Sequence, residues 1–304
     1  MISREGKDYL LLHFIVLIWG FTATLGLLIK IPPVEIVFFR TLIAAVALII
    51  LLAIQRVEFR IKKRKDLFII IGTGSLIAAH WILFFLSARI SNASVCLAGM
   101  ATCSLWTGLL EPLSQGRRIK GFEIILSIIA FIGIAVIFNT SFHYLTGLLV
   151  AVLSALIAAI FTIINGRFAN RYNPYVITRY EMVGACSAVL FFYPLYAAYF
   201  TNEIVWMPTL SDWIYLTALA IFCTVYAHAV SVELMRRLSA FSINLVVNLE
   251  PVYGIVLALI IFGNSEEMNA GFYLGTGLIL IAVLLYPSLN RRNRKRVLDT
   301  DIIR

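Results

Sequence analysis

Residues 34–54 read VEIVFFRTLIAAVALIILLAI, an apolar run with one acidic and one basic residue. A helix needs about 20 mainly apolar residues to cross a bilayer, so this stretch predicts a transmembrane helix. Strands of a membrane β-barrel would instead show segments of about 10 residues with alternating polarity. Similar runs recur along the chain, and we predict an all-α membrane protein with ten transmembrane helices. They cover residues 9–29, 34–54, 67–89, 93–112, 120–138, 144–165, 175–200, 212–235, 240–262 and 269–288.

The composition excludes an ordinary soluble protein. Hydrophobic residues make up 61% of the chain and charged residues 13%, whereas soluble domains average about 45–50% and about 25%. The net charge of +9 does not indicate nucleic-acid binding, because the charges stand in short clusters between apolar runs. The four cysteines form no CxxC pair, so we predict no disulfide framework, no metal site and no cofactor.

The distribution of basic residues predicts the orientation. If the N-terminus is cytoplasmic, every segment on that side is basic, while the opposite loops hold mainly acidic residues. Loops rich in lysine and arginine stay in the cytoplasm. We therefore predict a multi-pass protein of the plasma (cytoplasmic) membrane with both termini in the cytoplasm, ending in a basic tail over residues 291–304. That tail is either a solvated topology anchor or a site for anionic lipid.

The chain also contains an internal repeat of two halves with five predicted helices each. Arg40 of the first half aligns with Arg179 of the second, and His80 aligns with His228. Because five is an odd number, the halves enter the membrane from opposite sides, which makes an inverted repeat. Many secondary transporters are built this way, with the substrate site near the midplane at the repeat interface. The predicted halves cover residues 1–140 and 141–290.

Ionisable residues in the middle of predicted helices indicate where such a site lies. A charge at the bilayer centre costs about 2.5–3.5 kcal/mol on insertion scales, so it requires a partner or a cavity. His80 and His228 either bind substrate or carry a proton, since histidine titrates near neutral pH, or they form neutral interhelical hydrogen bonds. Glu250 precedes Pro251, which removes a backbone donor and interrupts the helix. The predicted substrate or proton site comprises His80, His228, Glu250, Asn244 and Asn248.

Arg40 and Arg179 stand near the starts of their predicted helices, Arg40 toward the outer face of the membrane and Arg179 toward the inner face. They either act as gates or anion-attracting groups at the two mouths, or extend their side chains to the interface. Glu181 and Glu233 either pair with these arginines or simply lie near the inner interface. Aromatic rings within the spans either pack or line a pocket for a planar or amphipathic substrate. The predicted pocket aromatics are Trp19, Trp81, Trp106, Tyr226 and Tyr253.

Four stretches stand out: LIWGFTATLGLLIK (17–30), FFR (38–40), FFLSARISNASVCLAGM (84–100) and LSAFSINLVVNLEPVYGIVLALIIFGN (238–264). Together they resemble the drug/metabolite transporter superfamily, specifically its EamA-type permeases. The resemblance implies ten helices, two inverted five-helix repeats and alternating-access transport of small metabolites, often as export. This sequence departs from the pattern where Cys103-Ser104 stands opposite Glu250-Pro251, and where Ala158-Ala159 stands opposite Trp19-Gly20.

We therefore predict a secondary transporter, acting as an exporter of a small polar or amphipathic metabolite such as an amino acid, and not an enzyme. The absence of a GxxxxGK[ST] motif argues against an intrinsic ATPase, and neither HExxH nor GxSxG is present. The alternatives are a membrane-embedded lipid-modifying enzyme and a channel. Expected partners are the substrate, the lipid bilayer and protons, with no nucleic acid. The chain is expected as a monomer or homodimer, and Gly271 and Gly275 indicate a close helix contact.

Overall fold

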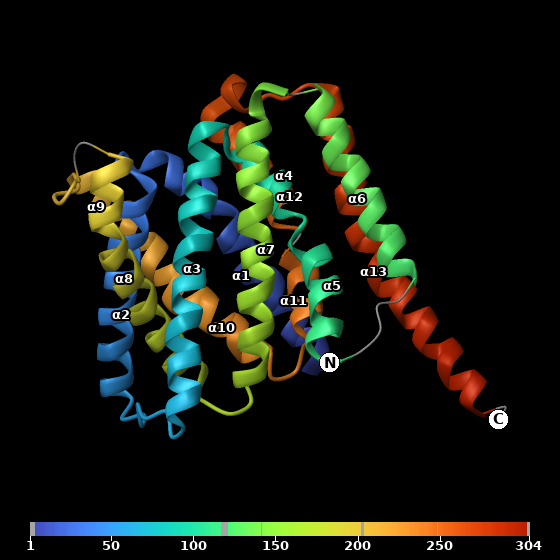
Figure 1. Cartoon of the computed structure of the whole chain (residues 1–304), viewed down its shortest axis with the longest axis horizontal. Coiled ribbons are helices and arrows are strands. Elements are labelled where there is room, and N and C mark those ends of the chain that lie inside the picture. Colours follow the sequence, from blue (N-terminus) through green and yellow to red (C-terminus); the bar gives the residue numbers. More distant parts are fainter. Residues whose placement is uncertain (1–3, 117–120, 141, 202–203, 248, 303–304) are drawn as a thin grey trace.

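The structure is a computed structural model that describes residues 4–116, 121–140, 142–201, 204–247 and 249–302. Every regular element in this part of the chain is helical (Figure 1). The elements are α1 (Arg4–Leu28), α2 (Pro33–Ile54), α3 (Arg64–Ile90), α4 (Ala93–Met100), α5 (Cys103–Ser114), α6 (Gly121–Thr140), η1 (Phe142–Tyr144), α7 (Leu145–Phe168), α8 (Pro174–Tyr199), α9 (Leu210–Ala218), η2 (Leu219–Tyr226), α10 (Ala227–Leu234), α11 (Ala240–Val247), α12 (Glu250–Phe262), η3 (Gly263–Glu266) and α13 (Ala270–Ile302).

The predicted all-helical architecture is confirmed. Seven helical segments of the described chain are long and apolar enough to cross a membrane, and two shorter apolar helices follow them. The full count of ten stays a prediction. The long segments are Gly6–Leu28, Pro33–Ile54, Arg64–Ile90, Ala93–Ser114, Leu145–Phe168, Pro174–Tyr199 and Leu210–Leu234, and the shorter ones are Glu250–Phe262 and Ala270–Ala282.

Several predicted spans are less regular than the apolar runs suggested. The span 93–112 consists of α4 and α5, separated by a turn in which the Thr102 hydroxyl donates to the Gly99 carbonyl. In the span 240–262 the helix α12 starts at Glu250, with Pro251 in its first turn. Proline suits that position because its missing N–H has no intrahelical acceptor there.

The span 212–235 contains a π-helix, η2, between α9 and α10. The hydroxyl of Thr224 donates to the carbonyl of Leu219, five residues earlier, at 3.1 Å. Segments of π-helix inside α-helices occur frequently at functional sites, because the wider turn changes which side chains face a neighbour.

The end of the chain, predicted as a basic tail, is helical where the structure describes it. The helix α13 continues to Ile302 without a break, so most of residues 291–304 extends the last helix. In Figure 1 this helix runs beside α6 and projects beyond the other helices.

Contacts at the two ends of the helices show that α1 and α7 run in opposite directions (Figure 1). Beyond the end of α10, Arg237 bonds to Asp8 near the start of α1. At the end of α3, the Ser87 hydroxyl donates to the carbonyl of Gly147 near the start of α7, at 2.8 Å. The third helical segment of each half therefore ends beside the first helix of the other half, as a pseudo-twofold axis requires.

Two glycine crossings bring helix backbones close together. At the crossing of α3 and α8, a Cβ at Gly74 would lie 2.1 Å from the carbonyl oxygen of Glu181, and one at Gly184 would lie 2.1 Å from that of Ile71. Small residues allow membrane helices to pack this closely.

The second crossing joins α6 and α13. A Cβ at Gly133 would lie 2.6 Å from the carbonyl oxygen of Gly275, and the reverse distance is 2.5 Å. The predicted close contact of the glycine motif in the last span is thus made by Gly275 within the chain. The contact leaves the choice between monomer and homodimer open.

Large apolar side chains also cover the outside of the helix bundle. Phe191 exposes 84% of its surface and Ile260 exposes 74%. Soluble monomers rarely expose large contiguous apolar patches. Such a surface is expected where the acyl chains of a bilayer surround the helices.

Candidate functional site

A cavity lies between side chains of the two halves and encloses about 740 Å³ of space, adjoining solvent included. Known small-molecule sites have mainly apolar walls and a few polar groups. Seven of the side chains predicted for the site line this cavity. They are Trp19, Arg40, His80, Trp81, His228, Asn244 and Glu250.

Four other predicted residues lie outside the lining of this cavity. The guanidinium of Arg179 lies over the Tyr180 ring at 4.4 Å and over the Phe59 ring at 4.9 Å. Trp106, Tyr226 and Tyr253 pack against the apolar core. Asn248 lies outside the described residues.

His80 is held by the hydroxyl and the backbone of Ser154 on α7. The Ser154 hydroxyl donates to the His80 carbonyl at 2.8 Å and lies 2.8 Å from the His80 Nδ1. Because that hydroxyl has a single proton, Nδ1 must be the donor to Ser154, and Nε2 is left as an acceptor. His80 is 8% exposed. The contact with Ser154 therefore holds a ring that is largely buried.

His228 occupies the equivalent position in the second half but has a different partner. Its Nε2 lies 3.0 Å from Oε2 of Glu181 on α8. Glu181 is fully buried, and its Oε1 has no hydrogen-bond partner among the described residues. The pair is therefore an imidazole and a carboxylate that share one hydrogen bond at the wall of the cavity.

In the described contacts, Glu181 and Glu233 pair with residues other than Arg40 and Arg179. Glu181 contacts His228 instead of an arginine of the repeat, and Glu233 forms ion pairs with Arg236 and Arg237. Sequence position alone put Glu181 near Arg179, but residues two apart on a helix point in different directions.

Arg40 lies in the cavity lining instead of at a mouth of the protein. Its Nε donates to the hydroxyl of Thr224 in η2 at 2.9 Å, and its guanidinium carbon lies 3.8 Å from the centroid of the Trp81 ring. Arg40 is 1% exposed, and its Nη1 has no hydrogen-bond partner in the described chain. The hydroxyl and the ring hold the guanidinium in place and leave one edge unpaired.

Glu250 lies at the start of α12, where the positive end of the helix dipole favours a carboxylate. It is 7% exposed and interacts electrostatically with Arg40. Nearby, the Asn244 amide donates to the hydroxyl of Thr107 on α5 at 2.7 Å, which joins the fourth segments of the two halves. Among the described residues, no group of three His, Cys, Asp or Glu side chains is arranged to hold a metal ion.

Some lining residues were missed that the repeat alignment could have found. Cys103, which aligns with Glu250, lines the cavity, and so does Ala158, which aligns with Trp19. Phe161 lines it too, one helical turn after Ala158. These residues are not polar enough to have been selected as site candidates. Cys103 and Ala158 could still have been predicted, because each aligns with a predicted site residue of the other half.

Comparisons with known proteins agree with this arrangement. The sequence pattern of the EamA-like transporter family matches residues 7–139 and again residues 145–286. An uncharacterized transporter of Clostridium kluyveri is 23% identical over 288 residues, which cover 88% of each chain. The uncharacterized transporter YxxF of Bacillus subtilis is 23% identical over 273 residues, covering 88% of this chain and 84% of its own.

A solved protein structure shares the fold, with a TM-score of 0.68 at 16% identity over 95% of this chain and 100% of the other. The family match and the long apolar helices define a multi-pass membrane transporter. The chain belongs to the EamA-like transporter family, whose unit it contains twice.

Proposed function

We propose that this transporter has ten transmembrane helices arranged as two inverted five-helix repeats, residues 1–140 and 141–290. Both termini lie in the cytoplasm, because the basic segments fall on one side of that arrangement. It exports a small polar or amphipathic metabolite, such as an amino acid, across the plasma membrane by alternating access.

One observation supports this proposal: equivalent positions of both halves line the same cavity. His80 and His228 are repeat equivalents and both line it, as do Cys103 and Glu250. If the two halves are similar and inverted, each can adopt the conformation of the other, and the cavity then changes the side to which it opens. Substrate sites of such transporters lie at this repeat interface.

Proton coupling is a second feature of the proposal. The Glu181–His228 pair, at 3.0 Å, is a buried acid–base pair in the cavity wall. One proton crossing 100 mV supplies about 2.3 kcal/mol, so the transfer of one proton per transport cycle is sufficient to drive accumulation. Uptake into vesicles should then collapse when a protonophore is added, and unchanged accumulation would reject coupling while leaving facilitated transport.

The main experiment is counterflow in proteoliposomes with a panel of unlabelled metabolites. We expect saturable uptake of a labelled compound, stimulated by the same compound inside the vesicle. His228→Ala should abolish it, whereas Arg167→Gln, at an exposed arginine outside the cavity, should not. Flux that neither saturates nor responds to internal substrate would indicate a channel instead. Protease accessibility of a C-terminal tag in oriented vesicles tests the proposed cytoplasmic ends.

A further inference from the structure

The loop between α7 and α8 is held from both halves of the chain at one end of the helix bundle. Arg236, which follows α10 in the same half, donates to the carbonyls of Ala169 and Tyr172 at 2.8 and 3.1 Å. Asp66, the third residue of α3 in the other half, accepts a hydrogen bond from the Tyr172 hydroxyl at 2.7 Å. We call the Asp66–Tyr172 contact the Tyr172 latch, and this end of the bundle the Tyr172 face.

The loop between α1 and α2 is held in the equivalent way at the other end of the bundle. Arg89, near the end of α3 in the same half, donates to the carbonyls of Ile29 and Ile31. Asp212, the third residue of α9 in the other half, accepts from the backbone N–H of Lys30 at 2.8 Å. We call the Asp212–Lys30 contact the Lys30 latch, and this end of the bundle the Lys30 face.

The two latches are separated by about the thickness of a membrane. Asp66 and Arg89 stand near the two ends of α3, about 35 Å apart along its axis at a rise of about 1.5 Å per residue. A bilayer measures about 30 Å across its hydrocarbon core and about 40–45 Å with its headgroups. Because α3 is long and apolar enough to cross a bilayer, each latched loop lies near a different surface of the membrane.

The same residue types hold both loops, because the third segment of each half carries them at equivalent positions. An aspartate is the third residue of α3 and of α9, and an arginine stands near the other end of each segment. A carboxylate in the first turn of a helix is favoured by the positive end of the helix dipole. Each aspartate holds the first loop of the other half, and each arginine holds the first loop of its own half. The repeat thus provides one contact between the halves for each face.

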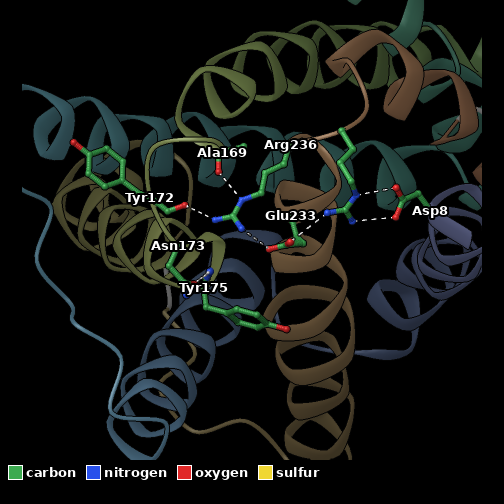
Figure 2. Close-up of polar contacts among 8 residues, drawn as sticks. Asp8, Ala169, Tyr172, Asn173, Tyr175, Glu233 and Arg236 are labelled. Carbon is green, nitrogen blue, oxygen red and sulfur yellow. Dashed lines mark hydrogen bonds and ion pairs between the residues drawn. The ribbon is translucent and has the colours of Figure 1, made fainter. Parts of the chain in front are cut away.

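The Tyr172 face carries a second connection between the halves (Figure 2). Arg237 donates to both carboxylate oxygens of Asp8 in α1, at 2.8 and 3.0 Å. Glu233 lies 3.5 Å from both Arg236 and Arg237, so it joins the two arginines into one network. A chain of contacts therefore runs from α1 of the first half, across the end of α10, to the loop between α7 and α8.

Each latch is strong enough to hold a face closed and weak enough to be released. In each, one hydrogen bond joins an aspartate to a neutral donor, the Tyr172 hydroxyl or the Lys30 backbone N–H. Burial and the hydrogen bond to Asp66 raise the pKa of Tyr172, so its hydroxyl stays a donor at physiological pH. A single hydrogen bond to a charged group shifts an equilibrium by about tenfold or more. Loss of one latch should therefore change how often a face opens without unfolding the protein.

The cavity reaches closer to the Tyr172 face than to the Lys30 face. Met235, which directly follows α10, and Ile243, in the first turn of α11, both line it. Toward the Lys30 face the described lining ends at Thr22 and Phe84, each about 9 Å before the end of its helix at about 1.5 Å per residue. Opening of the Tyr172 face therefore requires a smaller separation of the halves.

We infer that the two latches are the closing contacts of alternating access, one at each membrane face. This inference rests on the proposed transport function and specifies how its cavity is closed. Because each latch joins the two halves, the halves cannot separate at that face while the latch is intact. Release of one latch opens the cavity to one side and leaves the other side closed. Alternating access then consists of releasing one latch after the other has formed.

The test measures how fast a membrane-impermeant thiol reagent labels the cavity cysteines, Cys103 and Cys223. The background is the full-length protein in proteoliposomes, with Cys96→Ala and Cys186→Ala removing the other two cysteines. The reagent is supplied from one side of the vesicles at a time.

Two reporter variants identify the side that is being labelled. Each places a cysteine at an exposed loop position in a chain without other cysteines. Glu58→Cys reports on the Tyr172 face, since Glu58 precedes α3, and Met207→Cys reports on the Lys30 face, since Met207 precedes α9. The fraction of each reporter that is labelled gives the orientation of the protein in the vesicles.

The latch variants should each act on one face. Tyr172→Phe and Asp66→Ala should raise the labelling rate about tenfold from the Tyr172 face alone. Asp66 also forms an ion pair with the exposed Arg171 at 3.8 Å, so Tyr172→Phe isolates the hydrogen bond. Adding Asp8→Ala to Asp66→Ala should raise the rate further, because it removes the second connection at that face. Asp212→Ala should raise the rate several-fold from the Lys30 face alone, since the cavity ends farther from it.

The matched controls are Glu58→Gln and Thr209→Ala. Glu58 is an exposed acid on the Tyr172 face, and its variant should leave labelling unchanged. Thr209 and Asp212 form the capping box of α9, so Thr209→Ala weakens the start of that helix while keeping the acceptor of the Lys30 latch. It should raise labelling less than Asp212→Ala does.

The side of the effect distinguishes a released latch from a loosened protein. General loss of packing exposes the cavity cysteines to both faces, whereas a released latch exposes them to one. Equal effects on both faces would refute the latches, as would unchanged labelling after Asp66→Ala and Asp212→Ala. An effect of Thr209→Ala equal to that of Asp212→Ala would refute the Lys30 latch.

Labelling requires no transported substrate, so it tests the latches separately from the proposed function. A failed labelling prediction would reject the latches and leave transport standing. Absence of counterflow for every compound would reject transport and, with it, the cycle in which the latches act. If transport stands, Tyr172→Phe should lower the rate of counterflow, because a protein held open at one face returns more slowly. Unchanged counterflow beside raised labelling would refute the role of that latch in the cycle.

Discussion

The crossing of α3 and α8 supports a quantitative prediction about Gly74. A methyl group there would lie 2.1 Å from the Glu181 carbonyl oxygen, about 1.3 Å short of an ordinary contact of 3.4 Å. The obstacle is backbone, so it cannot rotate aside, and the two helices must separate. Overpacking of this kind typically costs about 1–3 kcal/mol. Relative to Gly72→Ala, Gly74→Ala should lower the free energy of unfolding by that amount and displace Glu181 from His228.

Gly72 provides the control on the same helix. A Cβ at Gly72 would meet no atom within 4 Å, so Gly72→Ala changes helix propensity alone, by up to about 1 kcal/mol in favour of alanine. The same gain applies to Gly74→Ala, and the difference between the variants isolates the crossing. Thermal unfolding in detergent, followed by tryptophan fluorescence, measures it. Equal unfolding midpoints for the two variants would refute the argument that this crossing requires glycine.

Three further predictions concern single contacts. Asn244→Ala should lower the free energy of unfolding by about 1 kcal/mol, and a double-mutant cycle with Thr107→Val should show coupling because the two side chains bond at 2.7 Å; additive effects would contradict the bond. Gly275→Ala should destabilise the protein relative to Gly277→Ala, since only Gly275 faces the backbone of α6, and equal midpoints would contradict the crossing. Trp19→Phe removes an indole donor to a carbonyl of η2 at 3.0 Å and should cost about 0.5–1.5 kcal/mol in thermal unfolding; an unchanged midpoint would show that the bond contributes nothing.

Much of the candidate site followed from the cost of burying charge in a membrane. His80, His228, Glu250 and Arg40 were predicted because an ionisable side chain in an apolar run requires a special environment. Their common cavity depends on helix packing, which brings together segments more than 100 residues apart. The same packing leaves Arg179 over two rings although its repeat equivalent lines the cavity. The repeat in the sequence therefore predicted how far along its helix each residue lies, but not whether that residue faces the cavity.

Partners proved harder to predict than positions. Ser154 and Glu181 lie in different helices, yet they bond to equivalent histidines of the two halves. Neither residue reveals its partner in its own stretch of sequence, because a serine or a glutamate on a membrane helix can bond to any of several neighbouring helices. Only the crossings of α3 with α7, and of α8 with α10, decide which neighbour it meets.

The sequence by itself determined that the chain is an all-helical membrane protein, because runs of about 20 apolar residues can satisfy their backbone hydrogen bonds only as helices in lipid. Its repeated stretches also indicated the family. Apart from the interruption at Pro251, which the sequence indicated, tertiary structure decided where the helices break, which arginine enters the cavity and which residues of opposite halves contact each other. The hydrophobic pattern does not predict these features, because lipid tails cover any apolar helix surface as favourably as another helix does. Which helices contact each other therefore depends on close packing and on a few hydrogen bonds.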